Sequence, residues 1–527
     1  MLTPASLRCL LPLGRKKGLS LLQTCRITGT QGRLTAGAAA AGVTEGEKRY
    51  KTFDDLPGPN LLTSIYWVFL KGYWQYSHEL QGVFKKKYGP IWKTTLGRYK
   101  VVNVVDVDLV ETILRKEGNY PIRNDMELWK IYRRMRDLEL GPFTVEGHRW
   151  KTLRTVLNTR MLKPGEALLY TDYINEVVTD FLLRLDELRE NSSSGVMVED
   201  VLKAMYRFAF EGISYILFET RIGCLEKQIS PDTQGFIDSI GGALKYAVLV
   251  TFFPQWTKSF LPIWDRYIAY WDHMFHFGKV LIDNKMNSIQ ERLDRGEEVK
   301  GEYLTYLLSS GKLTVKEVYS SVTELLLAGV DTTSNTLTWT MFLLSKHPEI
   351  QDQLFKEVSS VIPGRKIPTS DDINNMPLLK AVIRESLRIY PAVATNSRVV
   401  VEKPMVVGDY CFPEGTQFTL GHYQIAREEA NFPEPTKFIP QRWFRDQRVK
   451  NNPFSAIPFG HGIRACVGRR IAELEMYLAL SRIIQKYEIK PDPKGAKIRS
   501  VARLALVPNK PIRLEFHVRD QWAAHSS

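Results

Sequence analysis

The residues best suited to chemistry surround one cysteine near the end of the chain. Cys466 lies in the glycine-rich phrase Phe459-Gly-His-Gly-Ile-Arg-Ala-Cys-Val-Gly468, just before a helical pattern over residues 467–487. Backbone N–H groups and the positive end of a helix dipole favour a thiolate at such a position. No Cys-x-x-Cys pair supports a zinc or dithiol site. A lone thiolate can hold haem iron, in which case Phe459 would shield the sulfur and Arg464 would reach a haem propionate.

The spacing within this phrase carries a family resemblance. Phe-x-x-Gly-x-Arg-x-Cys-x-Gly resembles the haem-binding signature of the cytochrome P-450 superfamily at every fixed position, and the resemblance extends over residues 50–516. It implies the cytochrome P-450 fold, which is mainly α with small β regions: a single large helical domain with a β-rich edge. It also implies haem b with Cys466 as the axial thiolate ligand of the iron, and monooxygenase activity.

A second feature of the resemblance is an acidic and a basic residue three positions apart. Glu385 and Arg388 share one face of a predicted helix, a spacing that is common for ion pairs on solvated helices. Arg442 follows in the phrase Phe438-Ile-Pro-Gln-Arg-Trp443, between this helix and Cys466. The resemblance implies that Glu385, Arg388 and Arg442 form a buried structural network behind the haem and are not catalytic.

A third mark lies midway along a helical pattern over residues 315–345, which at 1.5 Å per residue spans about 45 Å. Ala328-Gly-Val-Asp-Thr-Thr333 is poor helix-forming material in a run otherwise rich in leucine. One interpretation has the threonine hydroxyls bonding back to the previous turn at a tolerated kink. The resemblance implies instead an opening beside the haem, where Thr332 holds dioxygen and water and, with Asp331, delivers protons for oxygen–oxygen cleavage.

Two further segments supply candidate contacts for the haem propionates. Trp150 and Arg154 lie one helical turn apart at the start of a predicted helix, and alone they would indicate a surface amphipathic turn. The resemblance implies that both contact a propionate. Arg398, in Thr395-Asn-Ser-Arg398, is a further candidate for a propionate or packing contact.

The elements that must position these residues are mostly helices. From about residue 145 to 387 apolar residues recur every three or four positions, and no Ser/Gly linker marks a domain boundary. Residues 91–96 and 100–105 predict a β-hairpin with Gly97 in the turn region. With 44% hydrophobic and 25% charged residues, the 527-residue chain is neither intrinsically disordered nor fibrous. Without zinc-finger spacing or a basic helix with interleaved aromatic residues, nothing favours a nucleic-acid partner.

The first 44 residues differ in character from the rest. They contain six Lys or Arg residues, no Asp or Glu, and only short apolar runs. This composition matches a mitochondrial transit peptide better than a secretory signal, with a basic disordered tail as the alternative. We therefore expect residues 1–44 to be a transit peptide and leader of undefined cleavage point, and residues 45–527 to form the haem-thiolate monooxygenase domain.

Two apolar segments suit the surface of a membrane. Residues 61–70 and 243–264 are rich in aromatic and aliphatic side chains, and Pro254 and Pro262 interrupt the second. Because no apolar run reaches about 18 residues, we expect interfacial insertion rather than spanning, with ordinary buried helices as the alternative. The expected location is the matrix side of the mitochondrial inner membrane, with peripheral or monotopic attachment.

We expect electrons to come from another protein, because no flavin or nicotinamide domain is recognised in the sequence. Lys380 and Arg384 lie four residues apart on the helix of Glu385, which also fits a solvated basic stripe. The resemblance implies that they bind an acidic, adrenodoxin-like [2Fe-2S] ferredoxin, and Arg469 and Arg470 could extend the patch. NADPH would act only indirectly, through ferredoxin reductase and the ferredoxin.

Within the mitochondrial branch, four phrases resemble the sterol 26/27-hydroxylase family: residues 121–129, 141–147, 331–339 and 468–475. This implies hydroxylation of the side chain of a lipophilic sterol (cholesterol, a bile-acid intermediate or vitamin D) with dioxygen. A vitamin D or retinoid hydroxylase or desaturase of the same branch is the alternative. A haem-thiolate isomerase would not need Asp331 and Thr332, and a haem sensor or carrier would not need a basic ferredoxin patch.

Overall fold

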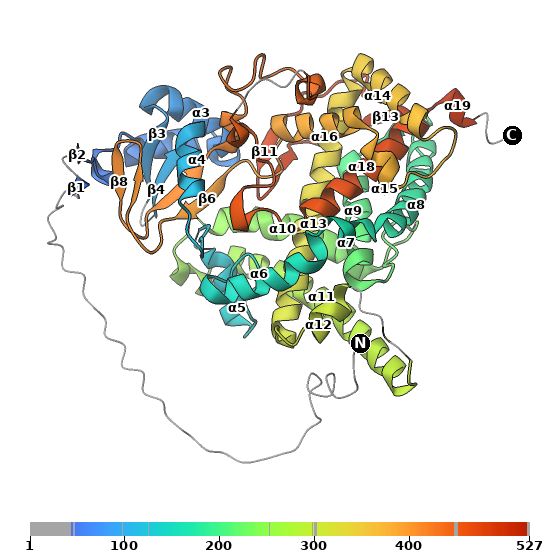
Figure 1. Ribbon diagram of the computed structural model, residues 1–527, viewed down its shortest axis with the longest axis horizontal. Coiled ribbons are helices and arrows are strands. Elements are labelled where there is room, and N and C mark those ends of the chain that lie inside the picture. Colours follow the sequence, from blue (N-terminus) through green and yellow to red (C-terminus); the bar gives the residue numbers. More distant parts are fainter. Residues whose placement is uncertain are drawn as a thin grey trace, which may run out of the picture.

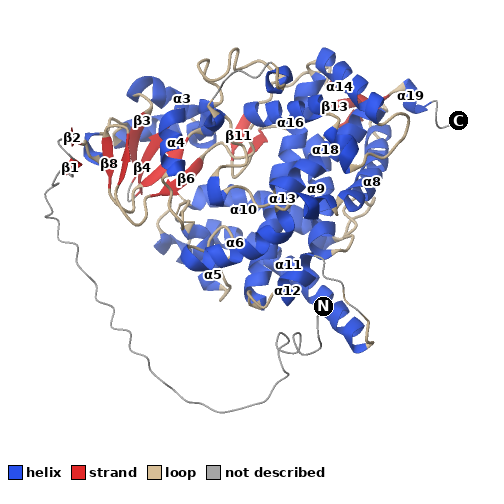
Figure 2. Cartoon of the chain, in the orientation of Figure 1, coloured by secondary structure: helices blue, strands red, loops and turns tan. Residues whose placement is uncertain are grey.

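The computed structural model describes residues 44–45, 48–96, 99–124, 126–251, 253–297, 299, 303–446 and 452–523. Nearly all of the predicted leader, residues 1–44, therefore lies outside the described residues. Figures 1 and 2 show a large helical body with a β-rich region at one side. This arrangement confirms the predicted fold class, mainly α with small β regions.

The helices and strands of the described residues have the following bounds. The α-helices are α2 (Leu61–Ile65), α3 (Ser77–Tyr88), α4 (Val107–Arg115), α5 (Glu127–Met135), α6 (Gly147–Met161), α7 (Pro164–Leu168), α8 (Thr171–Glu190), α9 (Val201–Phe218), α10 (Pro231–Val250), α11 (Pro262–Asp294), α12 (Tyr303–Ser309), α13 (Val315–Ser345), α14 (Pro348–Val361), α15 (Ser370–Asn374), α16 (Pro377–Ile389), α17 (His422–Ile425), α18 (Arg469–Lys486) and α19 (Asp520–Ala523). The short 3-10 and π turns are η1 (Phe53–Asp55), η2 (Tyr66–Leu70), η3 (Tyr73–Gln75), η4 (Gln255–Ser259), η5 (Pro440–Trp443), η6 (Pro453–Ser455) and η7 (Gly462–Arg464). The strands are β1 (Thr44–Glu45), β2 (Lys48–Arg49), β3 (Ile91–Leu96), β4 (Tyr99–Val104), β5 (Met197–Val198), β6 (Asn396–Val399), β7 (Met405–Val407), β8 (Tyr410–Phe412), β9 (Gln417–Leu420), β10 (Tyr487–Pro491), β11 (Ser500–Ala502), β12 (Leu506–Pro508) and β13 (Leu514–Val518).

Helix α13 runs through the middle of the helical body (Figure 1). Its first turn is fixed by a capping box, in which the side chains of Thr314 and Glu317 each bond to the backbone N–H of the other. The helix packs against α9, α11, α16 and α18, and its bounds confirm the pattern predicted over residues 315–345. Helix α13, which carries the candidate proton-delivery residues near its middle, is therefore packed against several other helices.

Four strands form the largest sheet, in the order β3-β4-β9-β6. Strands β3 and β4 pair antiparallel from Ile91↔Val104 to Leu96↔Tyr99, which confirms the predicted hairpin, whereas Gly97, expected in its turn, lies outside the described residues. Strand β9 lies parallel to β4 and antiparallel to β6. The sheet has its own small apolar core around Trp92 and Phe418, whereas the main core collects buried residues between Trp129 and Phe516.

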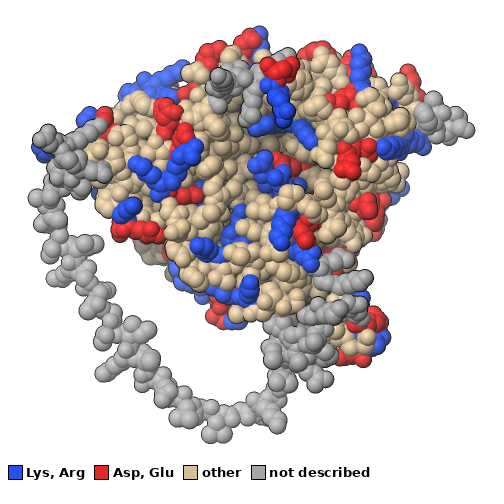
Figure 3. Space-filling model, viewed as in Figure 1, with Lys and Arg blue, Asp and Glu red and all other residues tan. Residues whose placement is uncertain are grey.

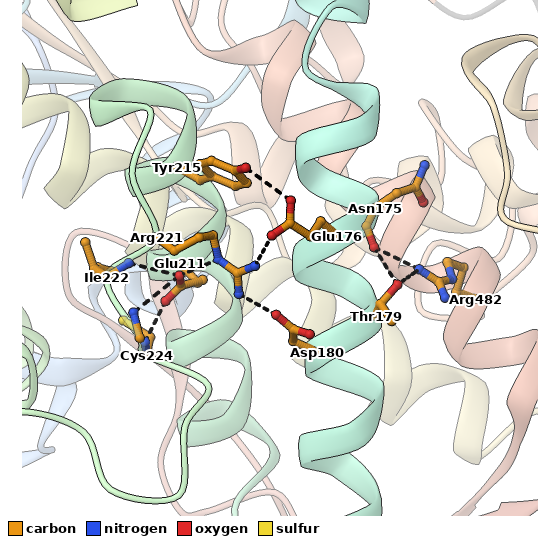
Figure 4. Close-up of polar contacts among 11 residues, drawn as sticks. Asn175, Glu176, Thr179, Asp180, Glu211, Tyr215, Arg221, Ile222, Cys224 and Arg482 are labelled. Atoms are coloured by element: carbon orange, nitrogen blue, oxygen red, sulfur yellow. Dashed lines mark hydrogen bonds and ion pairs between the residues drawn. The ribbon is translucent and has the colours of Figure 1, made fainter.

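A buried carboxylate ties the end of α9 to α8 (Figure 4). Glu211 accepts hydrogen bonds from the backbone N–H groups of Ile222, Gly223 and Cys224 and from Nε of Arg221, the last at 2.7 Å. The same guanidinium extends to two carboxylates of α8, those of Glu176 (2.7 Å) and Asp180 (2.6 Å). The cluster therefore fixes the turn after α9 by satisfying its backbone donors with one buried acid.

The two apolar segments predicted at a membrane are largely at the surface. Leu62 and Leu70 are each 76% exposed and Trp256 is 69% exposed. The alternative of an ordinary buried helix is therefore wrong for residues 61–70, although Ala243 and Val250 in the second segment are buried. Within the described part of the chain, no helix is both long enough and apolar enough to span a bilayer.

Candidate functional site

Cys466 closes a tight loop directly before α18. Its backbone N–H donates to the carbonyl oxygen of Phe459 at 2.8 Å, and the Ala465 N–H donates to that of Gly462 at 3.0 Å. Gly460 (φ 75°) and Gly462 (φ 71°) adopt left-handed backbone conformations that glycine tolerates at least cost. The glycines thus shape a turn that presents a half-buried sulfur at the N-terminal end of α18.

Opposing effects act on the pKa of the Cys466 thiol. The N–H of Gly468 and the guanidinium groups of Arg154 and Arg123 lower the pKa of Cys466, as a helix N-terminus should. Burial has the larger effect, and the net result is a pKa above the ordinary value. Iron bound at this sulfur would add the positive charge that favours the thiolate.

Three buried or partly buried arginines approach the backbone of this loop, and a fourth, Arg464, belongs to it. Nη2 of Arg123 donates to the carbonyl oxygen of Arg464 at 2.6 Å, and Nη2 of Arg398 lies 3.5 Å from that of His461. Arg154 donates to the carbonyl oxygen of Ala465, and Nε of Arg464 donates to that of Pro121 at 2.7 Å. The cluster joins α6, β6, the segment before α5 and the cysteine loop, which are distant in sequence.

The positive charge of this arginine cluster is not balanced by enough carboxylates, so the cluster fits an anionic ligand. Burial, followed by the neighbouring arginines, lowers the pKa of Arg123 to about 10 and that of Arg464 to about 9. Nε of Arg123 and Nε of Arg154 have no hydrogen-bond partner among the described residues, and only Arg398 forms an ion pair with a carboxylate there, that of Glu117. Unpaired buried donors and mutual repulsion are costly, so a group with two carboxylates, such as haem, fits this cluster.

Trp150 and Arg154 both face inward from α6. Trp150 is 1% exposed, and the guanidinium carbon of Arg464 lies 3.7 Å from its ring centroid, a cation–π contact. Arg154 is 8% exposed. The alternative of a surface amphipathic turn is therefore wrong, and the two residues lie with the arginine cluster beside Cys466.

The centre of α13 carries a second group of predicted site residues. From residue 320 to 345 every residue is buried except Ala328, Gly329 and Thr332, which share one face. Oγ1 of Thr332 donates to the carbonyl oxygen of Ala328 at 2.8 Å, so the back-bonding interpretation holds at this residue. Gly329 lets α9 approach closely, because an added Cβ would lie 2.8 Å from a side-chain carbon of Ile213. A small accessible patch thus interrupts an otherwise buried helix at Thr332.

Asp331 points to a different side of α13 from Thr332. Its carboxylate accepts a hydrogen bond from the hydroxyl of Tyr206, and Asn335 Nδ2 lies 3.3 Å away. Burial raises the pKa of Asp331, while Tyr206, Arg503 and the N–H of Ala505 oppose that rise. One oxygen, Oδ2, has no hydrogen-bond partner among the described side chains. Asp331 is therefore a buried acid of raised pKa behind the accessible patch, one residue from Thr332.

Glu385, Arg388 and Arg442 form one buried network. Arg388 donates to both carboxylate oxygens of Glu385 (2.9 and 2.8 Å), and Nε of Arg442 donates to Oε1 at 3.0 Å. Trp443 Nε1 also donates to Glu385, at 2.9 Å. Because the side chains of Glu385 and Arg388 are fully buried, the alternative of a solvated helix pair is wrong. The network holds the segment around residue 442 against α16.

Basic residues surround a hollow of about 700 Å³ on the other side of the cysteine loop. Lys380, Arg384 and Arg469 line it together with Phe459 of the loop. Glu473 also lines it and pairs with Arg469 at 3.0 Å, while exposed Arg470 lies 3.8 Å from the same carboxylate. Figure 3 shows Lys and Arg side chains with Asp and Glu among them on one face of the molecule. The structure thus brings the four predicted basic residues to one region next to the cysteine loop.

Two arginines of these surroundings were not predicted from the sequence. Arg123 belongs to the arginine cluster, and Arg445 lines the basic hollow. Arg123 lies within the phrase Pro121-Ile-Arg-Asn that was used only for its resemblance. Only the fold brings residue 123 to within 2.6 Å of a residue 341 positions later.

These features belong together in one class of protein. Residues 56–516 match the family model described as "Cytochrome P450", so the chain belongs to this family. The family confirms the expectation of a haem-thiolate monooxygenase that holds iron through a cysteine. The chain is 49% identical over 488 residues to "Sterol 26-hydroxylase, mitochondrial" of Oryctolagus cuniculus and 48% identical over 489 residues to the protein of that name of Homo sapiens; both alignments cover 91% of each chain. It is 38% identical to "25-hydroxyvitamin D-1 alpha hydroxylase, mitochondrial" of Homo sapiens, over 91% of this chain and 95% of that protein.

Proposed function

We propose that this protein is a mitochondrial monooxygenase that hydroxylates the side chain of a sterol. The observation that carries the chemistry is the single cysteine directly before α18, beside four arginines that lack sufficient anionic partners. The 49% identity to a sterol 26-hydroxylase, over nine-tenths of both chains, supports the substrate class. Cholesterol, bile-acid intermediates and vitamin D are the candidate substrates.

The residues of this chain divide the work as follows. Cys466 would hold the iron, and Arg123, Arg154, Arg398 and Arg464 would bind the two propionates, with Trp150 supporting Arg464. Phe459 would shield the sulfur. When bound, haem supplies the activation of dioxygen and the oxidation of an unactivated C–H bond.

Two residues of α13 handle protons. The hydroxyl of Thr332, now bonded to the Ala328 carbonyl, opens onto the accessible patch and orients water there. Burial raises the pKa of Asp331, which brings its carboxyl closer to the range in which it can exchange protons with water near Thr332. Glu385, Arg388 and Arg442 have a structural role.

We further propose that an adrenodoxin-like [2Fe-2S] ferredoxin binds at the basic hollow. Lys380, Arg384, Arg469 and Arg470 offer positive charge close to the cysteine loop, and charge complementarity steers such encounters. NADPH reduces the ferredoxin through a separate reductase. Replacing Lys380 and Arg384 with Gln should raise the Michaelis constant for ferredoxin and leave sterol binding unchanged. A Lys346→Gln variant, at an exposed site elsewhere, serves as control; equal constants for both variants refute this docking site.

The location follows from the relatives and the exposed apolar segments. We propose that residues 1–44 direct the protein to mitochondria and that residues 45–527 form the monooxygenase domain. The exposed faces of residues 61–70 and 253–260 would rest on the matrix side of the inner membrane, from which the sterol arrives. Attachment is peripheral or monotopic.

A second candidate function is hydroxylation of a vitamin D or retinoid substrate. The specific observation in its favour is the 38% identity to a vitamin D hydroxylase over 91% of this chain. Purified protein incubated with ferredoxin, its reductase, NADPH and a panel of sterols, secosteroids and retinoids decides between them. Side-chain hydroxylation fastest on sterols supports the first proposal, and a preference for secosteroids or retinoids replaces it with the second.

A haem-thiolate isomerase is the remaining alternative of a different reaction class. Thr332→Ala separates it from a monooxygenase, because only the latter needs controlled proton delivery. We expect the variant to consume NADPH while releasing hydrogen peroxide and little hydroxylated sterol. Unchanged coupling of NADPH to product contradicts the role of Thr332, and turnover without NADPH supports the isomerase.

A further inference from the structure

One buried histidine is left without a partner. His422, the first residue of the short helix α17, is 6% exposed, and neither ring nitrogen has a hydrogen-bond partner among the described residues. Buried polar groups in folded proteins are nearly always hydrogen-bonded. An imidazole with both nitrogens unsatisfied therefore indicates a missing ligand or solvent molecule.

The fold places His422 beside the arginine cluster. Helix α17 follows β9, and β9 pairs antiparallel with β6, the strand that carries Arg398. Arg398 is the charged side chain that acts on His422. The same guanidinium lies 3.5 Å from the carbonyl oxygen of His461 in the cysteine loop. His422 thus lies on the Arg398 side of the site, although it is distant in sequence from every haem contact named above.

The charge state of His422 limits what can bind there. Burial, and then the positive charge of Arg398, lower the pKa of His422 to about 4, so the ring is neutral at pH 7. A neutral imidazole has one N–H donor and one acceptor nitrogen. An anion held by Arg398 would accept the N–H bond and reduce the repulsion between the two side chains. A carboxylate is the group that meets both requirements.

We propose that His422 is a fifth propionate-binding residue, which donates its ring N–H to the haem propionate held by Arg398. The inference rests on the proposed function, because it assumes haem at Cys466. His422 would add a neutral hydrogen-bond donor to a cluster of cations. Such a donor orients a propionate without increasing the repulsion among the arginines.

The test compares rates of haem loss from the ferric holoprotein to excess apomyoglobin. His422→Leu should release haem about tenfold faster, the effect expected for loss of one hydrogen bond to a charged group. His422→Gln, which keeps an N–H donor, should remain within about threefold of the wild type. If His422→Leu does not fold, His422→Met replaces it, because its flexible side chain adapts to the pocket.

The chain offers a matched control. His78 is also buried, and burial also lowers its pKa to about 4, but its Nε2 lies 3.0 Å from the hydroxyl of Ser500. His78→Leu should lower thermal stability without changing the rate of haem loss. Equal haem-loss rates for wild type and His422→Leu, or an equal acceleration by His422→Gln and His422→Leu, overturn the inference.

Failure of the role proposed for His422 can be distinguished from failure of the proposed function. If the reduced wild-type protein with carbon monoxide lacks the red-shifted band of a thiolate-bound haem, the proposed function fails before the histidine variants are compared. If that band is present and the variants lose haem at the wild-type rate, only the role of His422 is wrong.

Discussion

A single buried carboxyl in α18 gives the protein a pH-dependent stability. Glu475 is 1% exposed and lies beside Gly212 of α9, where an added Cβ would be 2.8 Å from its Oε1. Burial raises the pKa of Glu475 to about 8, against a smaller opposing effect of the Thr333 hydroxyl. In the unfolded chain the group titrates near its ordinary value of 4.5. The folded state therefore retains a proton that the unfolded state loses between these two pH values.

The sign and size of the effect follow from proton linkage. Below pH 4.5 both states are protonated and Glu475 costs nothing electrostatically. As the pH rises, the unfolded state binds fewer protons than the folded state, so stability falls by about 1.4 kcal/mol per pH unit until the folded group titrates near pH 8. By pH 7 the loss amounts to about 3 kcal/mol, and Glu475→Gln should avoid it because an amide does not ionise.

The assay is urea unfolding of the haem-loaded protein at pH 5 and at pH 8. Relative to the wild type, Glu475→Gln should gain about 3 kcal/mol or more on going from pH 5 to pH 8. Glu473→Gln, two residues earlier on the same helix but ion-paired with Arg469 at the hollow, controls for removal of a carboxyl from α18. A difference between wild type and Glu475→Gln that does not change with pH refutes the reasoning.

Glu211→Ala should destabilise the protein by about 3 kcal/mol in urea unfolding, because it leaves the buried N–H of Cys224 and Nε of Arg221 without their acceptor, although Arg221 keeps its bonds to Glu176 and Asp180; a change below 1 kcal/mol contradicts the importance of this cluster. Arg388→Lys should sharply reduce the yield of haem-loaded protein, because an ammonium cannot replace the two parallel bonds to Glu385; wild-type yield would argue against it. Trp256→Ser should reduce cosedimentation with phospholipid vesicles several-fold at unchanged sterol turnover in detergent, and unchanged cosedimentation would remove residue 256 from the membrane contact.

Local sequence patterns predicted the helices and strands better than they predicted the surroundings of individual side chains. The helix over residues 315–345 and the hairpin at residues 91–104 follow from periodicity and turn chemistry, which act over a few residues. The inward orientation of Trp150 does not follow from a local pattern, because an isolated helical turn with Trp and Arg has no preferred partner. Arg123 shows the same limit, since only tertiary packing brings it to the cysteine loop.

The thiol of Cys466 shows why charge states resist prediction from sequence. The sequence correctly indicates a helix N-terminus behind the sulfur, and Gly468 N–H does lower the pKa. Burial, which no local pattern reveals, outweighs it. Likewise Asp331 and Thr332 are adjacent in the sequence, yet a helix turns successive residues by about 100°, so one faces Tyr206 and the other the accessible patch.

The most direct test of the account is the spectrum of the reduced protein with carbon monoxide, taken for the wild type and for Cys466→His. The account predicts that the wild type shows the red-shifted band of a thiolate-bound haem and that the variant loses both this band and sterol hydroxylation. A Cys466→His protein with the wild-type spectrum and undiminished turnover would contradict it.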